Sequence, residues 1–232
     1  RSLNSYAIRM FTNSKWDHCG IVVTTFKGQV YLFEALATGG AQLNYLEKRI
    51  TAELSSGAQV GIRHLKVANA RHVDAVKQKL QGFLREMSGR PYERNVAELV
   101  RSNHARNTEE DLSSVFCSEL VAAGLMEMGV LRRTKLSNNF VPGDFTAQMD
   151  FHEGYGFTNM LVFSYKSTGN GKGKKGKNKR LTRCVSIGEM GKRKVAQPSK
   201  QESLKRSSDD TTDGGTFVSP LLGRRGAKTV KL

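Results

Sequence analysis

Residues 16–35 have the sequence WDHCGIVVTTFKGQVYLFEA, and this stretch indicates a β-hairpin. Its first run, 16–26, is rich in apolar and β-branched residues, and a second such run, 29–35, follows Lys27-Gly28. Runs of this composition are typical of strands, and a glycine between them favours a tight turn. We therefore expect two antiparallel strands at the start of the domain.

The length of the connecting loop decides which side chains share a face of the hairpin. A three-residue loop at 26–28 places Glu34 opposite Gly20 and on the same face as His18, whereas a two-residue turn separates the pair. We expect the first register, in which Glu34 accepts a proton from the His18 imidazole. Asp17 could also orient His18, but adjacent strand residues face opposite ways, so we favour Glu34.

Hydrophobic spacing predicts the elements that follow the hairpin. A short helix is expected near 46–54, a strand at 59–67, a long amphipathic helix at 73–87 and a final strand at 160–165. Apolar residues at helical spacing predict another helix that begins near Cys117. The sequence thus predicts an α+β domain with an antiparallel sheet and a cysteine-bearing helix.

Cys117 stands at the expected start of the last of these helices, after the possible N-caps Ser113 and Ser114. Free N–H groups and the helix dipole at that end favour a thiolate, and the same groups can stabilise an oxyanion. With His18 as base and Glu34 as its orienter, Cys117 is a candidate nucleophile. The alternative is an inert core cysteine and a half-buried polar histidine.

Four blocks of sequence resemble a known family. They are FTNSKWDHCGIVV (11–23), YLFEA (31–35), FCSELV (116–121) and PGDF (142–145). These blocks are similar to those of permuted papain-like cysteine hydrolases of NlpC type, most closely the YiiX-like branch and more distantly the lecithin:retinol acyltransferase-like proteins. The resemblance spans about residues 6–165, and the histidine block precedes the cysteine block, as in that permuted group.

The resemblance implies a permuted papain-like fold and a thiol hydrolase or acyltransferase that acts on amide, ester or thioester bonds through an acyl-enzyme. Its implied substrates are acyl-bearing lipids or peptides, and no cofactor or metal is implied. Members of the family usually begin with a strand that this chain lacks, so we expect residues 1–165 to be a domain with a truncated N-terminus. A catalytically idle module that binds a lipid or a protein partner through the same groove is the alternative.

We expect structural roles for the other polar residues. Cys19 faces away from His18 and is expected to pack in the core, and Tyr92 and Glu119 are expected to be structural. Surface or capping roles are expected for the remaining histidines, His64, His72, His104 and His152. Three cysteines without metal-ligand spacing exclude a disulfide framework and favour a reducing compartment.

Residues 166–232 differ in composition from the rest of the chain. They contain 18 of the 37 Lys and Arg residues but 5 of the 21 acidic ones, and few apolar residues. Such a segment cannot bury enough surface to fold, so we expect a disordered basic tail that does not pack against the domain. We expect it to act first as a linker and second as a contact to an anionic membrane surface, with nucleic acid less favoured. A cytoplasmic protein, peripheral at membranes if the tail binds them, fits these features.

Overall fold

The computed structural model describes residues 14–25, 27–95, 97, 101–102, 104–167, 179–184 and 219–224. Its first two strands, β1 (His18–Thr24) and β2 (Val30–Leu36), form the expected antiparallel hairpin. Ile21 lies opposite Phe33, and the Thr25 amide donates a hydrogen bond to the Gln29 carbonyl at 2.8 Å. This is the register of a three-residue loop, as predicted. Gly28 has φ +73, a left-handed conformation that glycine adopts without strain.

The hairpin continues into one large sheet. Strand β3 (Gly40–Tyr45) pairs with β2, and after helix α2 (Leu46–Ser55) the chain forms β4 (Gln59–Ile62). Farther along the chain, β7 (Leu161–Ser167) pairs with β4 and with β8 (Lys179–Cys184), and β9 (Ser219–Arg224) lies between β1 and β4. The strand order is β3-β2-β1-β9-β4-β7-β8, and every pair is antiparallel.

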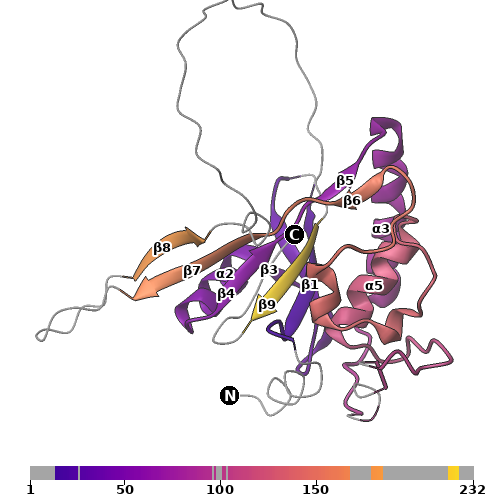
Figure 1. Ribbon diagram of the computed structural model, residues 1–232, viewed down its shortest axis with the longest axis horizontal. Helices are drawn as coiled ribbons and strands as arrows, with labels where there is room; N and C mark the ends of the chain where they lie inside the picture. The colour runs from indigo at the N-terminus through magenta and orange to yellow at the C-terminus, as the bar shows by residue number, and fades with distance from the viewer. Residues whose placement is uncertain are drawn as a thin grey trace, which may run out of the picture.

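The remaining described elements lie together on one side of this sheet (Figure 1). They are β5 (Leu65–Val67), the 3-10 turn η1 (Ala70–His72), α3 (Val73–Met87), α5 (Cys117–Glu127), η2 (Ser137–Asn139), η3 (Pro142–Thr146) and β6 (Tyr155–Phe157). Helices α3 and α5 pack against each other, and β5 and β6 form a separate two-stranded sheet. Mixed helices and antiparallel strands confirm the α+β class.

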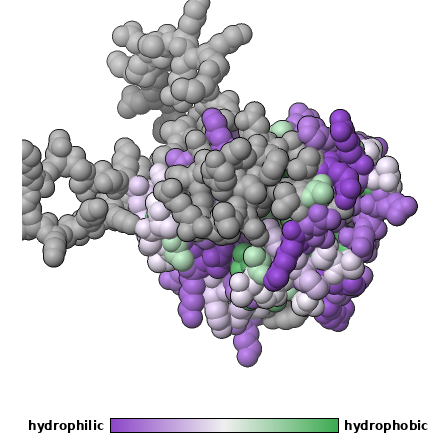
Figure 2. Space-filling model, turned by 90° about the horizontal axis from the view of Figure 1, so that it is seen from below, coloured by the Kyte–Doolittle hydropathy of each residue, from purple (hydrophilic) through white to green (hydrophobic). Residues whose placement is uncertain are grey.

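The two faces of β1 contribute to different hydrophobic clusters. Cys19, Ile21 and Val23 pack in the larger cluster, which also contains the buried residues of α3 and α5. Val22 points the other way and packs in a smaller cluster with Leu46 and Leu54 of α2. The sheet is therefore covered by α3 and α5 on one face and by α2 on the other. The face of the described part shown in Figure 2 is mostly hydrophilic.

Two expectations differ from the structure. The strand expected at 59–67 is two strands in two sheets, with a break at Arg63 and His64. The Arg63 guanidinium donates to the carbonyls of Phe145, Ala147 and Thr158. We expected residues 166–232 not to pack against the domain. This expectation is wrong for β8 and β9, which are strands of the main sheet. The rest of 168–232 lies outside the described residues.

Candidate active site

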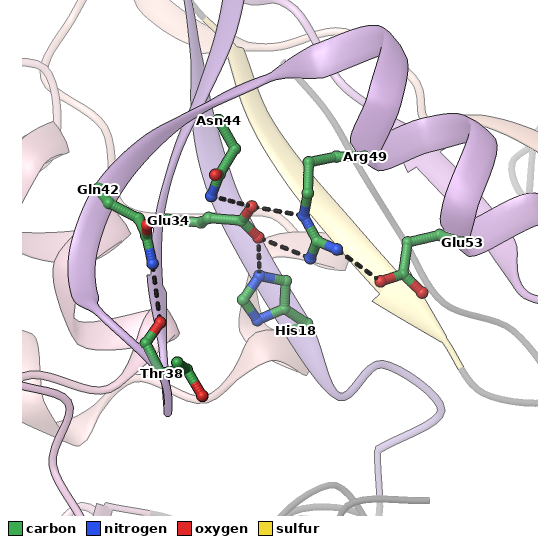
Figure 3. A network of polar contacts seen from close by, with 7 residues as sticks. All are labelled: His18, Glu34, Thr38, Gln42, Asn44, Arg49 and Glu53. Carbon is green, nitrogen blue, oxygen red and sulfur yellow. Dashed lines mark hydrogen bonds and ion pairs between the residues drawn. The ribbon is translucent and has the colours of Figure 1, made fainter.

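His18 and Glu34 meet on one face of the hairpin, as the register predicts. His18 is the first residue of β1, and its Nε2 lies 2.7 Å from Oε2 of Glu34 on β2 (Figure 3). The Glu34 side chain is completely buried, whereas the His18 side chain is 19% exposed. A buried carboxylate that holds one ring nitrogen fixes the orientation of the imidazole and leaves the other nitrogen for a second partner. Asp17 is not the residue that forms this bond.

Glu34 accepts three further hydrogen bonds from residues that the sequence did not indicate. Arg49 of α2 donates from Nε to Oε1 at 2.6 Å and from Nη2 to Oε2 at 2.9 Å, and Asn44 of β3 donates to Oε1 at 3.0 Å. Arg49 also pairs with Glu53, one helical turn later, at 3.0 Å. Figure 3 shows these side chains converging on the Glu34 carboxylate from β1, β3 and α2.

This network keeps the carboxylate of Glu34 ionised. Burial alone would raise the pKa of Glu34, but the hydrogen bond and charge of His18, followed by those of Arg49, lower it to about 2. Burial alone would lower the pKa of Arg49, but its hydrogen bonds and ion pairs with Glu34, followed by those with Glu53, raise it. Glu34 is therefore an anion at neutral pH, able to stabilise a positive charge on His18.

Cys117 is the first residue of α5, as expected, and its side chain is buried, with 2% exposure. The helix is capped differently from the prediction. Phe116 occupies the N-cap, and its amide donates to the carboxylate of Glu119 in the first turn at 3.2 Å. The hydroxyls of Ser113 and Ser114, the predicted caps, instead donate to Asp111 and Glu93.

The Cys117 thiol and the His18 imidazole interact electrostatically, and each shifts the pKa of the other. A hydrogen bond from the Cys19 thiol, followed by the charge and hydrogen bond of His18, lowers the pKa of Cys117 well below its usual range despite burial. Burial lowers the pKa of His18, but the charge and hydrogen bond of Cys117 and the contact with Glu34 outweigh it and raise that pKa to about 10. The arrangement thus favours a thiolate beside an imidazolium.

Cys19 and Tyr92 also lie near the thiol. Cys19 is buried in the core, as predicted, but it also contacts Cys117 through its thiol and its backbone amide. Burial, followed by the contact with Cys117, raises the pKa of Cys19, so its thiol stays protonated and able to donate. For Tyr92, burial and then the charges of Cys117 and Cys19 raise the pKa of the phenol. The alternation of faces in β1 gave no sign that Cys19 would interact with Cys117.

The remaining histidines lie away from this cluster. His72 is at the N-cap of α3, with its Nδ1 3.3 Å from the Tyr155 hydroxyl, and the amide of His64 donates to Thr158. His104 and His152 are exposed. In the part of the chain that the structure describes, no group of three or more His, Cys, Asp or Glu side chains could hold a metal ion. Nor does any helix of these residues have the length and hydrophobicity to cross a membrane.

Comparisons of the chain with protein-family models, with curated proteins and with solved structures gave no match. A thiolate at a helix N-terminus, an imidazolium beside it and a buried carboxylate on the far ring nitrogen are the groups that acyl transfer through a cysteine requires.

Proposed function

We propose that this chain is a cysteine hydrolase or acyltransferase of the permuted papain-like type, acting on amide, ester or thioester bonds. The observation that carries the proposal is the position of His18, whose ring is held by the buried Glu34 carboxylate at 2.7 Å and acts electrostatically on the Cys117 thiol. The order of the elements supports the permuted fold, because the strands with His18 and Glu34 precede the helix with Cys117.

The reaction follows from these roles. The Cys117 thiolate attacks the substrate carbonyl carbon, and the electron pair of the C=O bond moves to oxygen, near the free N–H groups at the start of α5. When this intermediate collapses, the leaving amine, alcohol or thiol takes a proton from the His18 imidazolium, and a thioester remains on Cys117. Neutral His18 then removes a proton from water or from an acceptor amine or hydroxyl, which attacks the thioester carbonyl. Collapse of this second intermediate breaks the C–S bond, releases the acyl group as an acid, amide or ester, and restores the Cys117 thiolate beside the His18 imidazolium.

The burial of Cys117 favours the second candidate, a catalytically idle module that binds a lipid or a protein partner. A sulfur with 2% exposure can be inert if no substrate reaches it. The two candidates differ in the reactivity of this thiol. An ionised thiol reacts with alkylating agents faster than a protonated one, provided that the reagent has access.

The test is to label the chain with limiting iodoacetamide and to measure modification of each cysteine by peptide mass spectrometry. Cys117 should react at least about tenfold faster than Cys19 or Cys184, because its thiol has a strongly lowered pKa, whereas the pKa of Cys19 is raised. His18→Ala should remove the difference, whereas His72→Ala, which deletes an exposed histidine elsewhere, should not. Slow, equal labelling of the three cysteines in the unaltered chain would favour the idle module.

Turnover completes this test. Incubation with a p-nitrophenyl ester should give a burst of nitrophenol equal to the enzyme present, and Cys117 should carry the acyl mass. Cys117→Ala should abolish both signals. Recruitment to anionic membranes by the basic tail remains a separate prediction, to be tested by vesicle binding at low and high salt.

A further inference from the structure

A cavity of about 630 Å³ lies beside the segment that leads into β1. Its wall is formed by residues 14–16, by Arg63 at the end of β4, by Lys135 after α5, by η3 and by residues 159–160 before β7. These segments are far apart in the sequence, so the cavity depends on the folded domain.

The charged side chains of this cavity are mostly cations. They are Lys15, Arg63 and Lys135, with Asp144 as the one acidic side chain of the lining. Lys135 forms an ion pair with Asp144 at 2.8 Å, which compensates one positive charge. Lys15 and Arg63 remain, so the lining carries a net charge of about +2 at neutral pH.

Arg63 is held in place by neutral acceptors. Its Nε donates to the Thr158 carbonyl at 2.9 Å, and its Nη1 donates to the carbonyls of Phe145 and Ala147, both at 2.8 Å. Within the described residues Arg63 forms no ion pair with a carboxylate. These three bonds use its Nε and Nη1 and do not involve its Nη2. Burial lowers the pKa of Arg63, which is the effect of a charge that lacks a compensating anion. A fixed, partly buried guanidinium of this kind favours an oxyanion.

The cavity lies close along the chain to one candidate catalytic group, because its lining residue Trp16 is two residues before His18. Trp16 also packs in the same hydrophobic cluster as Cys117. A substrate with its anionic group in the cavity would have to extend from Trp16 toward His18 and the thiol.

We propose that this cavity binds the anionic group, a carboxylate or a phosphate, of the acyl-bearing substrate, with Arg63 and Lys15 as its charged contacts. The assignment of that ligand as a substrate rests on the proposed function. The binding of an oxyanion does not, because it requires only the cavity and its cations. The two parts can therefore be tested separately.

Binding is tested with inorganic phosphate on the Cys117→Ala chain, which cannot react. Phosphate should raise the thermal midpoint above that in chloride of the same ionic strength, since a ligand that binds the folded state stabilises it. Lys15→Gln should weaken the phosphate affinity about two- to fivefold, as expected for loss of an exposed charge contact. Arg63→Gln should abolish the shift. Arg106→Gln, which deletes a cation from the other cavity, of about 400 Å³, should change nothing.

Arg63 also supports three carbonyls, so Arg63→Gln can lower stability by itself. Its midpoint without phosphate is measured for this reason, and Lys15→Gln, which alters an exposed side chain, provides the second test. Phosphate that stabilises the unaltered chain, Lys15→Gln and Arg106→Gln equally would overturn the anion site.

Substrate preference is tested with p-nitrophenyl esters of equal chain length that end in a methyl group, a carboxylate or a phosphate. The anionic esters should have the lower KM, and Lys15→Gln should raise only their KM, with kcat and the neutral ester unaffected. Comparison of the carboxylate and phosphate esters distinguishes an acyl acid from a phosphorylated lipid. Turnover without preference for anions would overturn the anionic substrate but leave the hydrolase. Phosphate binding that depends on Arg63, without turnover of any ester, would overturn the hydrolase but leave the anion site.

Discussion

Arg49→Gln tests the network that holds Glu34 beside His18. Arg49 donates two hydrogen bonds to the carboxylate of Glu34, at 2.6 and 2.9 Å, and one to Glu53 at 3.0 Å. In the variant the buried carboxylate keeps only His18 and Asn44 as donors. A buried anion then loses one of its two countercharges, Arg49, and keeps only His18, which is the main reason that the substitution should destabilise the fold.

The expected loss follows from burial. Removing one partner of a buried ion pair costs about 3–5 kcal/mol, because the other charge is left without compensation. The Glu34 side chain is 0% exposed but that of Arg49 is 23% exposed, so water partly screens the pair and we expect the lower end of the range. A loss of about 3 kcal/mol lowers the thermal midpoint of a chain of this size by about 6–12 °C. Arg49→Lys, which keeps the charge but not the paired geometry, should lose less.

The loss should depend on pH with a defined sign. His18 and Arg49 hold the pKa of Glu34 at about 2, against an ordinary value of 4.5. A carboxyl whose pKa is lower in the folded state contributes stability above the unfolded value and loses it as the pH falls toward the folded value. The difference in unfolding free energy between the unaltered chain and Arg49→Gln should therefore be full at neutral pH and shrink from about pH 4.5 to 2.

Urea unfolding followed by the fluorescence of Trp16, the one tryptophan of the chain, measures this difference. Lys48→Gln is the matched control, because it deletes the neighbouring cation of α2, whose Nζ lies 5.2 Å from the centre of the Tyr45 ring. A loss in Arg49→Gln of under about 1 kcal/mol, the value of a surface pair, would refute the reasoning. So would a loss that stays constant from neutral pH to pH 2.

Three further predictions concern other parts of the domain. The rate at which iodoacetamide alkylates Cys117 should change little between about pH 6 and 8, because its thiol is already ionised; Cys19→Ala should make this rate rise with pH, and Cys19→Ser should restore it. Burial, followed by nearby acids, raises the pKa of Glu119 to about 8, so this group favours folding at low pH and progressively destabilises the fold between about pH 4.5 and 8. Glu119→Gln should remove that slope in urea titrations, and an unchanged slope would contradict the assignment. Deletion of residues 219–232 removes β9 from between β1 and β4 and should lower the thermal midpoint, whereas the disordered tail expected from composition requires an unchanged midpoint.

The sequence was sufficient to predict the hairpin and its register. Strand composition, one glycine and a strict alternation of side chains placed Glu34 opposite Gly20, and these are local properties of twenty consecutive residues. The start of α5 at Cys117 was predicted for the same reason, from helical spacing within one segment.

The partners of Glu34 could not be predicted in this way. Arg49 comes from α2, and helical spacing does not tell which face of the sheet a helix will cover. The tertiary structure places α2 over the face with His18, so its guanidinium reaches the buried carboxylate. Cys19 illustrates a second limit. Alternation correctly directed it away from His18, but Cys117 of α5 interacts with both residues, because α5 packs against β1.

The candidate site is a row of alternating charges: the Arg49 guanidinium, the Glu34 carboxylate, the His18 imidazolium and the Cys117 thiolate. Each inner member has a countercharge on both sides, which explains why the pKa of Glu34 lies low and that of His18 high although both groups are removed from water. The row has no net charge, so its burial does not leave a single ion without compensation. A change at Arg49 should consequently extend to the thiol. Once Glu34 is free of Arg49, His18 is its one remaining countercharge beside the neutral donor Asn44, and a more strongly held imidazolium is a poorer proton donor to the leaving group. Arg49 is thus expected to influence the rate of acyl transfer without touching the substrate.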